Sequence, residues 1–203
     1  PGQTTLLGTI VMAAFAILFG VRNIHANEHH PGLMAAISAE SLVKLAAALI
    51  VGGSIATIVA AGPIDLIETA LDNPELRLLM QPDLDLSWWA MTLLSGFAIL
   101  CLPRQFHVAV VENTHVGDIR TAAWLFPAYL IAINLFVVPV ALAGLLLFAG
   151  GDVNADTFLV TVPLALNQPG LALLAFIGGL SAATSMIVVG TVALSTMVYN
   201  DLI

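Results

Sequence analysis

Long runs of apolar residues alternate along the chain with short segments that hold most of its charges. A helix needs about 20 apolar residues to cross the hydrocarbon core of a bilayer. Runs of this kind cover residues 5–21, 31–61, 87–111, 121–148 and 169–200. We therefore predict an all-α polytopic membrane protein with about five transmembrane helices, for which lipid is the main solvent.

Residues at the edges of these runs agree with membrane helices. Pro31 suits the first turn of a helix, and Trp88 and Trp89 open the third run with residues typical of a membrane interface. Pro103 predicts a break inside the same run, because proline lacks the backbone N–H that a helix uses. The stretch after Pro169 spans about 46 Å at 1.5 Å per residue, so we expect it to tilt or to extend beyond the bilayer.

Composition supports the membrane class and removes others. The 203 residues are 60% hydrophobic and only 9% charged. A formal net charge of -8, with five Lys and Arg residues, leaves no basic surface for nucleic acid. Cys101 is the single cysteine, so neither a disulfide framework nor a cysteine-based zinc site is available.

The distribution of basic residues predicts an orientation. Arg22, Arg104 and Arg120 lie in or beside the segments after the first and third runs. Residues 62–86 hold six acidic residues and one basic residue, Arg77, and residues 150–156 hold no basic residue. Cytoplasmic loops carry an excess of Lys and Arg. We therefore predict that the N-terminal end lies outside and the C-terminal end in the cytoplasm, with one or two short amphipathic helices from residues 62–86 on the outer surface.

The fifth run carries a stripe of hydroxyl groups. Ser181, Thr184 and Ser185 are spaced i, i+3 and i+4, which places them on one helix face, and Thr191 and Ser195 prolong it. Sodium prefers oxygen ligands, and helix hydroxyls supply them at membrane depth. The alternative is structural, because such hydroxyls often bond their own preceding turn or allow close helix packing.

Ionisable residues give two further predictions. Glu40 and Lys44 stand in the favourable order for a helical ion pair, which we expect to be structural rather than a coupling or gating pair. His25, His29 and His30 lie in a polar segment and are expected to be a solvated turn, so we predict no metal site.

Polar residues follow the break at Pro103. Gln105 and His107 come directly after Pro103 and Arg104. Carbonyl groups freed by a break are tolerated at membrane depth where they line a wet cavity, which favours a solute path. The alternative is a kinked cytoplasmic end whose polar side chains reach water.

Several motifs together resemble the sodium/solute symporter family. The sequence reads FGVR at 19–22, EHHPGL at 28–33 and AESLVKL at 39–45. LPRQFHV at 102–108 and GGLSAAT at 178–184 are similar to the symporter-type N-terminal domain of large bacterial sensor histidine kinases. The resemblance covers essentially the whole chain, residues 1–203.

The resemblance implies a ten-helix inverted-repeat fold of the LeuT type, of which this chain supplies core helices 4–8 with a severed start. It implies a cation between core helices 1 and 8 and places the helix-eight hydroxyl at Ser181. Family members usually have a second hydroxyl at the next position, which is Ala182 here. We therefore expect Thr184 or Ser185 to complete a site for Na⁺ or H⁺.

The solute pocket is expected to differ from that of proline symporters. Those proteins carry aromatic residues one and two turns before the proline of core helix six, where this chain has Ile99 and Ser95. The substrate path implied by the resemblance and by the break passes Ser95, Ile99, Pro103, Gln105 and His107.

The resemblance implies a transport and sensing domain in a bacterial inner membrane. Its expected solute is an amino acid, with histidine favoured, and its output is a histidine kinase module after Ile203. Its other partners are lipid and the rest of its own chain, core helices 1–3 and 9–10. No catalytic residue or cofactor is expected in these 203 residues. A stand-alone symporter is the alternative, followed by a membrane enzyme or scaffold.

Overall fold

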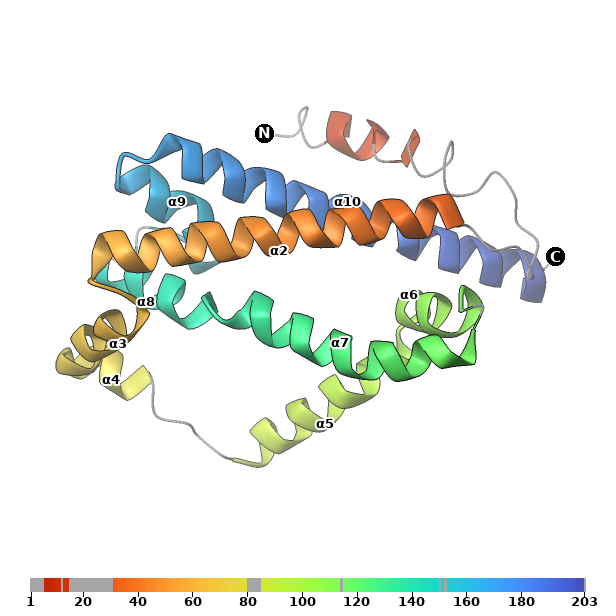
Figure 1. The fold of residues 1–203 in the computed structure, drawn as a ribbon, viewed down its shortest axis with the longest axis horizontal. Helices are drawn as coiled ribbons and strands as arrows, with labels where there is room; N and C mark the ends of the chain where they lie inside the picture. The colour runs from red at the N-terminus through yellow and green to blue at the C-terminus, as the bar shows by residue number, and fades with distance from the viewer. Residues whose placement is uncertain are drawn as a thin grey trace. The chain divides into compact units, whose positions relative to one another are not determined.

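The computed structural model describes residues 6–11, 13–14, 31–79, 85–113, 115–149, 151 and 153–202. All regular structure in these ranges is helical, which confirms the predicted all-α class. Of the first predicted run, residues 5–21, the structure describes residues 6–11 and 13–14, and these are helical. In chain order the elements are α2 (Pro31–Val59), α3 (Pro63–Asp72), α4 (Pro74–Leu79), α5 (Leu86–Cys101), α6 (Pro103–Phe106), the π-helix η1 (His107–Val111), α7 (Val116–Asn134), α8 (Val137–Leu147), the 3₁₀-helix η2 (Ala155–Thr157), α9 (Phe158–Ala165) and α10 (Pro169–Leu202) (Figure 1).

Three segments within the described ranges are long and apolar enough to cross a membrane. They are Met34–Val59, Val116–Leu147 and Pro169–Tyr199. At a rise of 1.5 Å per residue, even the shortest exceeds a hydrocarbon core of roughly 30 Å. Length and composition therefore support a membrane protein.

The predicted break in the third run is confirmed. Helix α5 ends at Cys101, and Leu102 adopts the extended backbone (φ -76°, ψ 121°) that a following proline favours. Pro103 then opens α6, where its missing N–H costs no helical hydrogen bond. The N–H of Leu102 still donates to the carbonyl of Ala98 at 3.0 Å, so the end of α5 is capped.

The fourth run is two helices rather than the single one predicted for residues 121–148. A turn at Leu135 and Phe136 separates α7 from α8. Pro139 lies in the first turn of α8, and its ring would clash with a helical carbonyl at Leu135, four residues earlier. Proline therefore explains the interruption.

Two short helices, α3 and α4, occupy the acidic segment for which one or two were predicted. Pro63 opens α3, and the carboxylate of Asp65 accepts a hydrogen bond from the N–H of Ala61 at 2.9 Å, which supports the helix start. Leu66 and Ala70 are buried on one face, and α3 packs against α8. The apolar face of α3 thus packs into the apolar core, as its amphipathic spacing allows.

The chain forms two compact units, one of residues 1–40, 84–122 and 182–203 and the other of residues 41–83 and 123–181. The core of the second unit combines α2, α3, α4, α8, α9 and the start of α10. Its buried residues are Val51, Ile55, Ala56, Leu66, Ala70, Leu76, Val140, Leu142, Ala143, Phe158, Val162 and Ala175.

Glycine allows the closest approaches in this core. A Cβ added at Gly52 would overlap the side chain of Phe136, and one added at Gly144 would overlap the ring of Phe158. The Phe158 ring also stacks on that of Phe148, with centroids 5.8 Å apart. Missing side chains at Gly52 and Gly144 therefore make room for aromatic rings, as small residues do in membrane helix packing.

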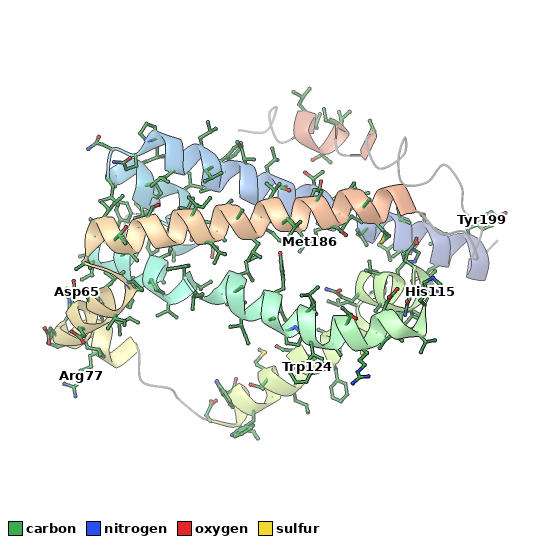
Figure 2. All side chains as sticks on the ribbon, viewed as in Figure 1. Asp65, Arg77, His115, Trp124, Met186 and Tyr199 are labelled. Carbon is green, nitrogen blue, oxygen red and sulfur yellow. The ribbon has the colours of Figure 1, made fainter. Side chains whose placement is uncertain are left out.

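Large apolar side chains remain exposed along the long helices. Examples are Trp124 on α7 and Met186 on α10, both labelled in Figure 2. The side chains of Ile131 and Leu173 are also exposed. In water such exposed apolar surface would favour association. This exposure is consistent with contact between these helices and lipid tails.

Candidate functional site

The hydroxyl stripe of α10 divides by hydrogen bonding. Ser181, Thr184 and Ser185 are all half-buried. Within the part of the chain that the structure describes, the hydroxyls of Ser181 and Ser185 donate no hydrogen bond. These two hydroxyls therefore differ from the ones that bond their own preceding turn, and close helix packing stays the structural alternative for them.

The last two hydroxyls of the stripe, those of Thr191 and Ser195, form hydrogen bonds within α10. The Thr191 hydroxyl donates to the carbonyl of Ile187 at 2.8 Å, and the Ser195 hydroxyl donates to that of Val192 at 2.9 Å. Both bonds reach back into the preceding turn of the same helix, as is common for Ser and Thr in membrane helices. Thr191 and Ser195 are thus explained by local structure.

The predicted substrate path follows α5, α6 and η1. Ser95 is exposed on α5, and its hydroxyl donates to the carbonyl of Met91 at 2.8 Å. Pro103 and Gln105 are half-buried on α6, which packs against both α5 and η1. The side chain of Ile99 lies outside the described part. Of these residues, the structure groups Pro103, Gln105 and His107 in two adjoining short elements.

His107 and Glu112 form a buried polar pair in the described part of the chain. The side chain of His107 is 9% exposed and that of Glu112 is 3% exposed, and Nε2 of His107 lies 3.5 Å from Oε1 of Glu112. Although the two atoms are within ion-pair range, Nε2 has no hydrogen-bond partner of good geometry in the described part of the chain. A buried nitrogen without a partner is uncommon and can mark a functional position.

The π-helix explains why this pair was missed in the sequence. At 3.6 residues per turn, positions five apart in an α-helix point about 140° away from each other. In η1 the N–H of Glu112 instead donates to the carbonyl of His107 at 3.0 Å, so the helix widens and the fifth residue returns to the same face. Single π-turns of this kind often occur at functional sites.

Lys44 has an aromatic neighbour that the sequence pattern does not reveal. Its Nζ lies 5.8 Å from the centroid of the Tyr129 ring, within range for a cation–π contact. The Tyr129 hydroxyl donates to the backbone carbonyl of Ser41 at 3.3 Å, which links α7 to α2. The ion pair with Glu40 stays a prediction.

Metal ligands do not gather in the described ranges, where no three His, Cys, Asp or Glu side chains come together. The histidines at 25, 29 and 30 lie outside these ranges. Comparison with known proteins adds no assignment, because no family model, curated protein or solved structure matches the chain.

Proposed function

We propose that this chain is the central part of a LeuT-type transport and sensing domain that binds an amino acid, with histidine favoured, and couples its passage to Na⁺ or H⁺. The observation that carries the proposal is the pair of unbonded hydroxyls, Ser181 and Ser185, on an apolar helix of membrane length. A hard cation takes oxygen ligands of this kind. Thr184, which is half-buried and precedes Ser185, is the alternative ligand that the resemblance allows.

A second set of residues supports a path for the solute. The break at Pro103 and the buried pair of His107 and Glu112 place polar groups directly after an apolar helix. Polar groups inside membrane proteins usually line cavities or pathways, because lipid cannot solvate them. In our proposal the output of the domain is control of a histidine kinase module in a bacterial inner membrane.

Uptake of labelled L-histidine into vesicles that contain the intact protein tests the proposal. We expect uptake to rise when a sodium or proton gradient is imposed and to fall when that gradient is collapsed. A panel of other amino acids identifies the solute if histidine is not taken up. Neither uptake nor binding of any amino acid, with correctly inserted protein, would contradict a transport or sensing role.

Replacing Ser181 by alanine is expected to raise the half-saturating cation concentration for solute binding about tenfold or more. An interaction between a hydroxyl and a charge contributes about 1.5–3 kcal/mol, which corresponds to this range. Ser195→Ala is the matched control, since it removes the same group from a half-buried position on α10 whose hydroxyl bonds its own helix. Thr191→Ala should likewise have a smaller effect. Equal shifts in all three variants would mean that the stripe is structural.

The proposed orientation predicts opposite accessibility for two surface positions. In a Cys101→Ser background, a cysteine at Asp156 should react with a membrane-impermeant maleimide added to whole cells. A cysteine at Arg120 should react only after the membrane is opened, because loops rich in basic residues face the cytoplasm. Labelling of the Arg120 position in intact cells would contradict the orientation.

A further inference from the structure

Lys44 occupies an unusual place for a basic residue. Of the four basic residues in the described ranges, it alone lies more than two turns inside a helix that is long and apolar enough to cross a membrane. Ten residues separate it from Met34, the start of that candidate span, which is about 15 Å along the axis. The other three lie on short helices or in the first turns of a long one: Arg77, Arg104 and Arg120.

Tyr129 holds the ammonium group in a defined position. The Tyr129 ring lies beneath Lys44 Nζ, and its hydroxyl is tied to the carbonyl of Ser41. Ser41 and Lys44 are three residues apart, so they share one face of α2. Lys44 and Tyr129 are both half-buried.

The donors of Lys44 are not filled. An ammonium group has three N–H donors, and Lys44 donates no hydrogen bond to any residue that the structure describes. A cation–π contact stabilises a charge by less than the cost of placing that charge at the centre of a bilayer. An acceptor with negative charge would therefore complete the environment of Lys44.

We propose that Lys44 and Tyr129 form a site that binds the carboxylate of the solute. This inference rests on the proposed function, because it takes the ligand to be an amino acid. The carboxylate accepts hydrogen bonds from the ammonium of Lys44, and the Tyr129 ring lies beside it as an apolar wall. Glu40, one turn earlier on the same helix, is the carboxylate that would compete with the solute if the predicted ion pair forms.

Paired ligands separate recognition of the carboxylate from general binding. Binding of L-histidine is compared with binding of histamine, the same molecule without its carboxylate, to the intact protein in phosphatidylcholine vesicles. We expect Lys44→Met to weaken L-histidine binding at least tenfold and to change histamine binding less than twofold. Other amino acids and their decarboxylated amines replace this pair if the solute is not histidine.

Four variants control for structure and for charge. Lys44→Arg should retain most of the preference for the carboxylate, and Tyr129→Phe, which keeps the ring, should change affinity less than about threefold. Arg77→Met removes a basic residue outside the long helices and should have no effect. Glu40→Gln should leave affinity unchanged or raise it, because it removes the competing carboxylate.

Three results would overturn this assignment. Equal binding of L-histidine by Lys44→Met and the unmodified protein would remove Lys44 from the site. Equal losses for L-histidine and histamine would indicate a general structural defect. Stabilisation of the unmodified protein but not of Lys44→Met by added phosphatidylglycerol, with solute binding unchanged in the variant, would identify a lipid phosphate as the partner. If the unmodified protein binds no amino acid, the proposed function itself fails, and this site fails with it.

Discussion

Replacing Ile131 by arginine is expected to lower the apparent membrane-insertion equilibrium of segment 116–147 about 100- to 1,000-fold. Ile131 stands near the middle of this candidate span, and its side chain is 70% exposed. Transfer of an arginine to the centre of a membrane helix costs about 2.5–3.5 kcal/mol on insertion scales, whereas isoleucine is slightly favourable. Insertion is measured by glycosylation of acceptor sites placed on either side of the segment in microsomes.

Ile64 on α3 provides a matched control for this prediction. It is 73% exposed, so the same substitution is made at nearly the same exposure. Residue 64 lies outside the three candidate spans, and we expect Ile64→Arg to change stability by no more than about 0.5 kcal/mol. Comparison of the Ile131→Arg and Ile64→Arg variants thus shows whether lipid or water surrounds each helix. A harmless Ile131→Arg would mean that α7 faces water and would refute the membrane placement of this helix.

Replacing Gly144 by valine is expected to lower the thermal midpoint of the protein in detergent by about 6–12 °C. The added side chain would occupy the space of the Phe158 ring, and overpacking a close-packed core typically costs about 1–3 kcal/mol. We use the upper end of this range of free energies, about 3 kcal/mol, because Gly144 and Phe158 are both buried and α8 packs directly on α9. For a protein of this size, 1 kcal/mol shifts the midpoint by about 2–4 °C.

Two further variants show whether the Phe158 ring is the cause. Gly179→Val is the control, because Gly179 is also inside a helix and an added Cβ there meets no atom within 4 Å. Phe158→Ala opens the space next to Gly144, so the double variant should be less destabilised than the sum of the two single variants. A coupling free energy of about 0.5–3 kcal/mol is expected for residues in contact. Additive effects would show that the two residues do not touch.

Much of the secondary structure follows from local signals. Pro31, Pro63, Pro103 and Pro169 each stand at the first residue of a helix. Proline has a suitable φ and lacks an N–H, so it is favoured where the helix does not need that donor. Pro139 carries the same information, yet we predicted a continuous helix there, because the apolar run on both sides hides the interruption.

The candidate site is less predictable than the helices. The spacing of Ser181, Thr184, Ser185, Thr191 and Ser195 predicts one hydroxyl stripe, but it does not distinguish its members. The hydrogen bonds of these hydroxyls distinguish the members, because the side-chain rotamer determines whether a hydroxyl bonds its own backbone or another partner. Only the structure separates Ser181 and Ser185 from the rest of the stripe.

The sequence by itself determined the helical class, the membrane-length apolar segments and the break at Pro103, because these depend on composition and on neighbours within a turn or two. The tertiary structure decided that Tyr129 meets Lys44, that Glu112 returns beside His107, and that Phe158 fills the space left by Gly144. Two of these contacts join different helices, and the third needs a π-turn. Each depends on how backbone segments pack or widen, which residue spacing alone does not specify.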